Sequence, residues 1–351
     1  MQTCLKNAVT LVVGWTAIAS FSKNLQAEPL LTIPTVDVGN PGNADASAAN
    51  TTSGQSGAYG YGGVDYDFEI GTTEVTINQY VTFLNAVATS PSASFGIATL
   101  WKSAMQDSAN VLAISRTTVN GLYNYQVIGD GTRPISMINW YDAARFANWM
   151  NNGATVGAST ETGAYNLNGA TSGIFNRQPG ATWFIPNENE WYKAAYYDPT
   201  MFGGTGGYHL FANQSDVMSS HELGVPGAAN YSYPNAAGGS APRINVYQGT
   251  VVKVSPTEAY DTISYYGTYD QTGNVAEWTE TINGLAPVPR GGGWSYLVDT
   301  TSAAFHDSLA SGSYSTGSGF RLATIPEPSA GGLLLLAMVS LAGARKRLRS
   351  R

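Results

Sequence analysis

Two carboxylates beside a glycine turn are the residues of this sequence best suited to holding a metal ion. Asp270 and Glu277 bracket a short segment that contains Gly273. A tight glycine turn can direct backbone carbonyls inward, and hard cations such as Ca²⁺ take about six to eight oxygen ligands from carboxylates, carbonyls and water. The alternative is a polar turn that stabilises itself, because Asn and Asp side chains readily hydrogen-bond to nearby backbone groups.

The cysteine and histidine content, together with the absence of several known motifs, argues against most other kinds of catalytic or binding site. The only cysteine, Cys4, precedes the first apolar run and should leave with a leader, so the mature chain has no thiol. His209, His221 and His306 are not paired at a metal-binding spacing. The sequence has no G-x-S-x-G, Walker or dinucleotide motif, and the glycine run 291–293 lies in strand-like sequence rather than at a helix start.

Composition indicates a compact domain rich in loops. The chain has 351 residues, of which 43% are hydrophobic, 11% aromatic and only 12% charged, and it contains 40 glycines. This content of apolar and aromatic residues excludes a disordered chain. The net charge is −7, whereas nucleic-acid binders typically carry a basic surface, so no nucleic-acid partner is expected.

The first 27 residues read as a secretory signal peptide. Lys6 supplies a positive charge, Ala8–Ile18 forms a short apolar core, and small residues follow. Cleavage after Ala19 or after Ala27 would fit. The alternative is an uncleaved anchor, although the apolar run is short against the ~20 residues that a membrane span needs.

The C-terminal segment, residues 326–351, reads as a surface-sorting signal. The triplet Pro326-Glu327-Pro328 is followed by an apolar run, Gly331–Gly343, and then by a basic cluster up to Arg351. A brief apolar segment stopped by basic residues is held in the inner membrane with its charges inside. This arrangement resembles the PEP-CTERM signal, which implies a Gram-negative bacterium that makes exopolysaccharide and processing by an exosortase-type enzyme. The alternative is a permanent C-terminal anchor.

Capping signals predict three helices, over residues 76–88, 140–151 and 188–197. Thr76, Asn139 and Asn187 are suited to the N-cap positions, and the first and third have Gln or Glu three residues later, as in a capping box. Gly153 and Pro199 mark the ends of the second and third. The rest should be short strands and loops. Six tryptophans are expected in the core: Trp140, Trp149, Trp183, Trp191, Trp278 and Trp294.

Six segments, in order along the chain, carry a family resemblance. They are FEIGTTEVTINQYVTFLNAVA from Phe68, RPISMINWYDAARFANWMNN from Arg133, WFIPNENEWYKAAYYDP from Trp183, YDQTGNVAEW from Tyr269, RGGGWS from Arg290 and GFRLA from Gly319. Together they resemble the formylglycine-generating enzyme, or sulfatase-modifying factor, family. The resemblance implies an α+β fold, a loop-rich variant of the C-type lectin fold with few helices, over residues 28–325.

The resemblance also implies metal ligands. At the first calcium site of the family, Asp270 and Glu277 would bind by side chain, and Gly273 and Val275 by carbonyl. A second site maps onto Asn230, Tyr231, Asn245 and Tyr247. Asn245 stands where the family often has an aspartate, which removes charge there. The alternative at both sites is a polar turn without an ion.

The catalytic cysteines of the family are missing. The family oxidase binds copper with two thiolates shortly after its GGSW motif, and those positions fall at about Tyr296 and Thr301 here, with Gly293 in place of the motif serine. Soft sulfur ligands suit Cu(I) and hydroxyl oxygens do not. No copper and no catalytic residue are therefore expected. Branches with non-haem iron use histidines, which this chain lacks at a suitable spacing.

Two hypotheses follow. The first is a non-catalytic, calcium-stabilised binding or structural module, held transiently in the inner membrane and then placed on the cell surface, outer envelope or extracellular matrix, where it contacts exopolysaccharide or matrix proteins. The alternative is an oxidase of the same family, of the formylglycine-generating or non-haem iron type. A bound transition metal would favour the oxidase.

Overall fold

The computed structural model describes residues 27–52, 56–107, 111, 113–218, 220–234, 240–241, 245–247, 250–252, 254–306 and 309–326. The expected signal peptide and sorting signal lie outside these residues, apart from residue 27 and residue 326 respectively. Within the described part of the chain, no helix is long and apolar enough to cross a membrane.

One sheet joins the beginning of the domain to its end. Its strands follow the order β1 (Thr35–Val38), β2 (Phe68–Gly71), β15 (Ala323–Thr324) and β5 (Trp183–Phe184). All neighbours are antiparallel, and Ala323 stands opposite both Ile70 of β2 and Phe184 of β5. The last strand of the domain is therefore enclosed between strands that come much earlier in the chain.

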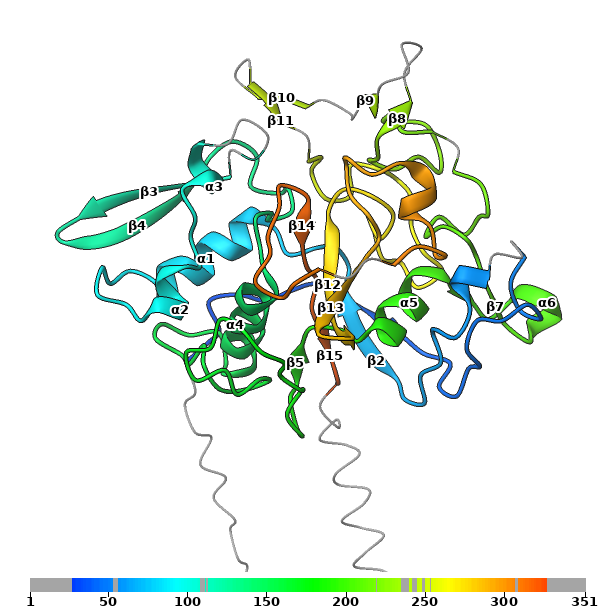
Figure 1. The fold of residues 1–351 in the computed structure, drawn as a ribbon, viewed down its shortest axis with the longest axis horizontal. Helices are drawn as coiled ribbons and strands as arrows, with labels where there is room; N and C mark the ends of the chain where they lie inside the picture. Colours follow the sequence, from blue (N-terminus) through cyan, green and yellow to red (C-terminus); the bar gives the residue numbers. More distant parts are fainter. Residues whose placement is uncertain are drawn as a thin grey trace, which may run out of the picture.

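A second sheet lies at the centre of the molecule (Figure 1). The strand β12 (Ala276–Asn283) pairs antiparallel with β13 (Ala286–Arg290) and parallel with β14 (Ser318–Gly319). At eight residues, β12 is longer than the short strands expected for this region. Its extra length comes from the β12–β13 hairpin, whose distant half, Thr279–Asn283, is progressively less buried.

The other strands form separate two-stranded pairs. They are β3 (Ile114–Val119) with β4 (Leu122–Val127), β6 (Tyr197–Asp198) with β7 (Gly207–Tyr208), β8 (Tyr233–Pro234) with β9 (Ser240–Ala241), and β10 (Asn245–Tyr247) with β11 (Thr250–Val252). The turn of the β3–β4 hairpin is Asn120-Gly121, with φ of 51° and 79°. Positive φ at both central residues is typical of the tight hairpin turn that Asn-Gly favours.

The three expected helices are confirmed, with their caps. Helix α1 spans Ile77–Val87, α4 spans Trp140–Asn151 and α5 spans Glu188–Tyr196, and all three begin with a reciprocal capping box. Helix α5 ends one residue before the prediction, because Tyr197 leaves the helical conformation and pairs with Tyr208 of β7. The prediction missed the short helices α2 (Phe95–Ala98), α3 (Ala104–Asp107) and α6 (Met201–Gly204), and two 3-10 turns, Ser56–Ala58 and Val298–Thr301.

Aromatic side chains fill the core between these elements. Phe83 of α1 meets Phe146 and Trp149 of α4 with ring centroids 5.2 and 5.4 Å apart, and Phe320 lies 5.3 Å from Phe146. Five of the six tryptophans expected in the core are at most 8% exposed, and Trp183 is half-buried against it. Aromatic rings bury a large apolar area each, so they can stabilise a domain with few helices.

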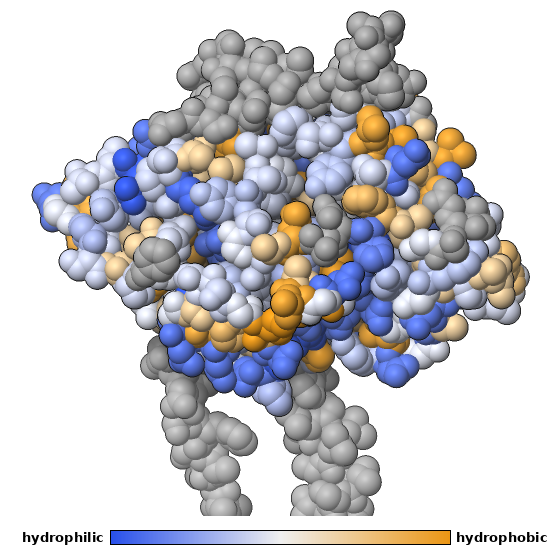
Figure 2. Space-filling view, in the orientation of Figure 1, coloured by the Kyte–Doolittle hydropathy of each residue, from blue (hydrophilic) through white to orange (hydrophobic). Residues whose placement is uncertain are grey.

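The architecture confirms the expected α+β class. In Figure 1, α1 and α4 lie on one side of the central strands and α5 lies on the other, with long loops between them. Figure 2 shows apolar and polar residues interspersed over this face, apart from a small apolar group near its lower centre. The described part of this face therefore shows no broad apolar area of the kind that marks a large protein interface.

Candidate functional site

A buried ion pair lies at the point where the family segments converge. The guanidinium of Arg321 donates from Nε and Nη2 to the two carboxylate oxygens of Glu277, at 2.5 and 2.6 Å. Trp191 also donates from Nε1 to Glu277, at 2.8 Å. None of these three side chains is exposed to solvent. Both oxygens of Glu277 therefore have strong hydrogen-bond partners within the protein.

The same guanidinium also binds two backbone carbonyls. Arg321 donates from Nη1 to the carbonyl of Gly71 at 2.9 Å, and from Nη2 to the carbonyl of Tyr269 at 2.8 Å. Gly71 closes β2, and Tyr269 opens the segment with the predicted calcium ligands. One arginine thus joins three of the six family segments, and Trp191 adds a fourth through Glu277.

Of the predicted calcium ligands, Asp270 lies in a strained turn. Its φ is 59°, and its Oδ2 accepts a hydrogen bond from the backbone N–H of Glu258 at 2.9 Å. Burial raises the pKa of Asp270 to about 7. Gly273 also has a positive φ, 87°, and a side chain there would come within 2.3 Å of the carbonyl oxygen of Asn230, so only glycine fits.

The structure brings the first predicted site against part of the second. The carbonyl of Asn230 accepts a hydrogen bond from the N–H of Asn274 at 2.8 Å, and the Asn230 amide donates to Asn274 Oδ1 at 3.2 Å. Tyr231 is buried, with its ring 6.0 Å from that of His221, and Val275 is fully buried. Asn245 and Tyr247 belong to β10, and their side chains lie outside the described part of the structure.

Sequence reasoning missed Glu74 as a member of this cluster. It is 1% exposed, and neither carboxylate oxygen has a hydrogen-bond partner among the described residues. Burial raises the pKa of Glu74 well above its usual value, and the nearby charges of Asp270 and Glu277 raise it further, whereas Arg321 acts in the opposite direction. Glu74 lies within the first family segment, which was its only signal in the sequence. The cluster holds more acidic groups than Arg321 can neutralise.

The described residues contain no group of three or more His, Cys, Asp or Glu side chains arranged to hold a metal ion. His209 lies 3.5 Å from Asp198, and His306 packs with its ring 5.7 Å from that of Tyr61. An ion at the predicted first site would therefore need backbone carbonyls in addition to Asp270. The carbonyl of Gly273 accepts no hydrogen bond from the described residues and could supply one such ligand.

Tyr296 and Thr301, near which the family resemblance places the cysteines, make structural contacts. The N–H of Tyr296 donates to the carbonyl of Gly293 at 2.8 Å, and its ring lies 6.3 Å from that of Phe305. Thr301 is fully buried, and its hydroxyl donates to the carbonyl of Val298 at 2.8 Å. Oxygen atoms are the only polar groups that these side chains offer, so they do not suit Cu(I).

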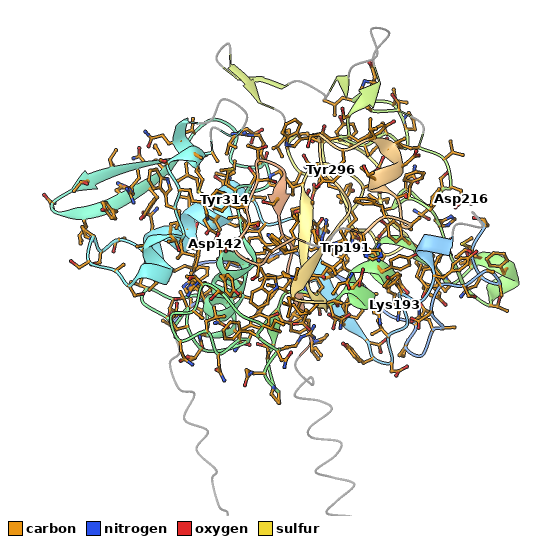
Figure 3. All side chains as sticks on the ribbon, in the orientation of Figure 1. Asp142, Trp191, Lys193, Asp216, Tyr296 and Tyr314 are labelled. Atoms are coloured by element: carbon orange, nitrogen blue, oxygen red, sulfur yellow. The ribbon has the colours of Figure 1, made fainter. Side chains whose placement is uncertain are left out.

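A separate cavity of about 500 Å³ opens beside the start of α4. Figure 3 shows Tyr314 and Asp142 on the side of the molecule where α1 and α4 lie, and Trp191 on the other side of β12. Four stretches of chain form the cavity wall, and its lining residues are Ala98, Thr99, Trp101, Lys102, Ser103, Asn139, Thr171, Gly312 and Tyr314. Its volume falls in the range of about 300–1,000 Å³ typical of small-molecule sites.

The charged residue of the cavity lining, Lys102, belongs to an ion pair. Lys102 Nζ donates to Asp142 Oδ2 at 2.5 Å, and the same oxygen accepts the N–H of the helix cap, Asn139, at 2.9 Å. Burial raises the pKa of Asp142, and the ammonium of Lys102 acts in the opposite direction. Lys102 also lies 4.9 Å from the centre of the Tyr314 ring, within the range of a cation–π contact.

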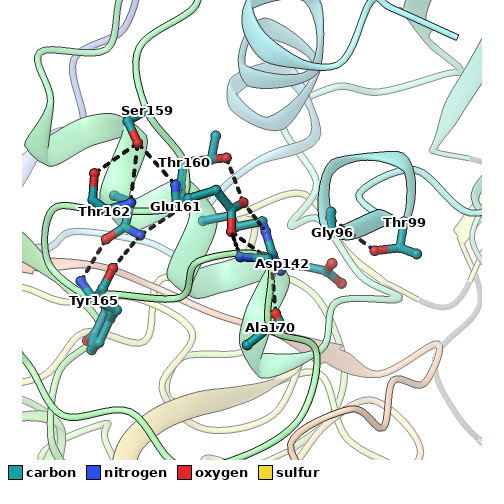
Figure 4. A network of polar contacts seen from close by, with 12 residues as sticks. Gly96, Thr99, Asp142, Ser159, Thr160, Glu161, Thr162, Tyr165 and Ala170 are labelled. Atoms are coloured by element: carbon teal, nitrogen blue, oxygen red, sulfur yellow. Dashed lines mark hydrogen bonds and ion pairs between the residues drawn. The ribbon is translucent and has the colours of Figure 1, made fainter. Parts of the chain in front are cut away.

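Arg145 attaches a neighbouring loop to the helix that carries Asp142. In Figure 4, Asp142 lies between the segment with Gly96 and Thr99 and the loop with Glu161 and Ala170. Arg145, one turn further along α4, binds Glu161 at 2.7 Å and the carbonyl of Ala170 at 2.9 Å. The loop that reaches the cavity through Thr171 is thereby attached to the helix whose first turn carries Asp142.

The fold and its converging segments define a loop-rich α+β domain of the sulfatase-modifying factor type. The model of the family described as "Sulfatase-modifying factor enzyme 1-like domain" matches residues 45–325. The chain therefore belongs to this family, which confirms the resemblance seen in its six segments. No curated protein sequence matches the chain.

Solved structures with a related fold are similar at low sequence identity. Treponema denticola variable protein 1 is 16% identical, with a TM-score of 0.46 over 83% of this chain and 95% of that one. CarF is 17% identical, with a TM-score of 0.46 over 85% of this chain and 100% of its own. PvdO from Pseudomonas aeruginosa is 15% identical, with a TM-score of 0.42 over 84% and 93%.

We predict that Arg321→Met destabilises the domain by about 3–5 kcal/mol, because it leaves the Glu277 carboxylate buried without its counter-charge. Urea unfolding followed by tryptophan fluorescence would measure the loss. The matched control is Arg116→Met. Arg116 is half-buried over the rings of Trp101 and Tyr123, at 3.9 and 4.3 Å from their centroids. Such contacts contribute about 0.5–1 kcal/mol at exposed sites. Equal losses in both variants would contradict a central role for Arg321.

Proposed function

We propose that this chain is a non-catalytic binding or structural module of the cell surface or extracellular matrix. One observation carries the proposal: the chain has no cysteine beyond Cys4, and Tyr296 and a fully buried Thr301 stand at about the positions where the resemblance places the family's copper-binding cysteines. A cavity with a different lining lies beside α4 and includes neither residue. The scaffold is thus retained, while the groups needed for the family oxidation are replaced.

The direct test of this proposal is an assay for the oxidase reaction. We expect no conversion of cysteine to formylglycine in a Cys-x-Pro-x-Arg peptide incubated with the purified protein, copper and a reductant. Cu(I) needs soft ligands, and the chain beyond Cys4 has no cysteine to supply them. Mass spectrometry would follow the change from thiol to aldehyde.

An active formylglycine-generating enzyme is the positive control in this assay, and heat-inactivated protein is the negative control. Turnover above the negative control would overturn the proposal and make the family oxidase the better description. Metal analysis of the same sample would then identify copper or iron as the site metal.

We also propose that calcium stabilises the domain near Asp270. Two observations support it. The buried carboxyl groups of Glu74, Asp270 and Glu277 have Arg321 as their counter-charge, and the carbonyl of Gly273 accepts no hydrogen bond from the described residues. A cation at this point would favour the ionised form of these carboxyl groups, which burial disfavours. Oxygen ligands from one carboxylate, carbonyls and water suit Ca²⁺.

Chelation should therefore lower the melting temperature. An ion that binds only the folded state stabilises it by RT ln(1 + [L]/Kd), which is about 2.7 kcal/mol at a hundredfold excess over Kd. Asp270→Asn keeps the size of the side chain and the acceptor for Glu258 but removes the charge. We expect this variant to melt lower and to be insensitive to EGTA in differential scanning calorimetry.

The calcium test needs a variant that leaves the Arg321–Glu277 ion pair intact. Glu277→Ala cannot report on calcium, because it also breaks the ion pair with Arg321. Asp299→Asn, at an exposed position in the 3-10 turn, is the control and should respond to EGTA as the wild type does. A wild-type melting curve that is unchanged in excess EGTA would rule out a stabilising calcium ion.

Export and surface sorting complete the proposal and rest on the sequence of the two ends. We expect the chain to begin near residue 20 or 28 and to be cut close to Pro326-Glu327-Pro328 by an exosortase-type enzyme. Intact-mass measurement of the protein released from cells would check both ends. A mass that includes the basic stretch 345–351 would contradict processing at the sorting signal.

A further inference from the structure

We propose that the cavity beside the start of α4 binds an uncharged sugar residue of a glycan, held between Trp101 and Tyr314. The inference rests on the proposed binding function and names the ligand class and the site. A pyranose ring has apolar C–H faces and a rim of hydroxyl groups. It therefore needs aromatic walls and polar groups at the rim, and this cavity offers both.

The two aromatic walls come from distant parts of the chain. Trp101 follows α2, and its indole N–H donates to the carbonyl of Ile114 at 3.1 Å, which fixes the ring. The guanidinium of Arg116 lies over that indole, 3.9 Å from its centroid. Tyr314 is 49% exposed, although an aromatic side chain is costly to leave in water. A bound sugar ring would cover part of this exposed surface.

The polar groups around the cavity suit hydroxyls. Lys102 carries three N–H donors and uses one for Asp142, so others remain for a ligand. Asn139 uses its side-chain oxygen to cap α4, which leaves its amide as a donor. Thr99 and Ser103 add hydroxyl groups to the lining. Each of these groups can exchange hydrogen bonds with a sugar hydroxyl.

The charge of the site favours a neutral ligand. Lys102 is the charged residue of the lining, and the buried carboxylate of Asp142 balances it at 2.5 Å. The Oδ1 atom of Asp142 is buried and accepts no hydrogen bond from the described residues. An anionic sugar would compete with Asp142 for Lys102, and a cationic ligand would meet the ammonium at the wall.

The test uses the purified full chain and titrations with maltotriose, cellotriose, chitotriose and, as a charged ligand, trigalacturonic acid. Intrinsic tryptophan fluorescence and isothermal titration calorimetry would both report binding. We expect saturable binding of at least one neutral trisaccharide, and weaker or no binding of the charged one. Tyr314→Ala should weaken binding about tenfold, because it removes one aromatic wall.

Tyr265→Ala is the matched control. Tyr265 is 41% exposed and does not line the cavity, so its removal should leave the affinity unchanged. A second variant, Ser103→Phe, should block the cavity and reduce binding without removing any existing contact of Lys102. Both variants should melt close to the wild type, since each changed residue is exposed.

Three results would overturn the inference: no binding of any neutral trisaccharide, binding of the charged ligand alone, or equal loss of affinity in the Tyr314 and Tyr265 variants. None of these affects the proposal that the chain lacks the oxidase reaction, because that reaction is measured on a cysteine peptide. Conversely, turnover of the peptide would overturn the non-catalytic function without deciding whether Tyr314 binds a sugar.

Discussion

The bidentate contact between Arg321 and Glu277 is the interaction on which the rest of this fold depends. It lies where short sheets and loops meet and where helical packing is sparse. An arginine fork binds a carboxylate with two parallel hydrogen bonds and still has donors for backbone carbonyls. Here those extra donors bind Gly71 and Tyr269, so a single side chain fixes the relative positions of β2, β12 and the turn at Asp270.

Other buried or partly buried ion pairs lie around the core. Only 12% of the residues are charged, yet several arginines are placed inside the protein. The further pairs are Arg290 with Glu188 at 2.6 Å, Arg177 with Glu190 at 2.7 Å and with Glu280 at 2.6 Å, and Arg145 with Glu161 at 2.7 Å. Burial of such charges costs desolvation free energy, so they contribute little net stability but penalise wrong partners. A loop-rich chain has few repeating backbone hydrogen bonds to specify its fold, and directional ion pairs can serve instead.

Elements that depend on nearby residues could be predicted from the sequence, whereas elements that depend on distant contacts could not. The starts of α1, α4 and α5 depend on caps within four residues, so the sequence alone located them. The end of α5 depends on a strand that follows later in the chain, and it was placed one residue too far.

The candidate sites also contain one feature that the local sequence predicts and others that only the tertiary fold creates. The turn around Gly273 was visible from its residue types, and its tight contact with Asn230 accounts for the glycine. The surroundings of Glu74 are set by residues about 200 positions later, and the cavity beside α4 combines Lys102 with Tyr314. No pattern of spacing in the sequence brings such residues together, because only the tertiary fold determines their distance.

The enclosed position of β15 has a consequence for how the domain is made. Ala323 pairs with β2 and β5 at once, and Arg321 completes the central ion pair just before it. Neither can form until nearly the whole domain has been synthesised. Long-range pairings of this kind close slowly and leave earlier segments without their partners. Folding of this domain is therefore completed from its C-terminal end, and a chain shortened before Arg321 would lack the contacts that bring its segments together.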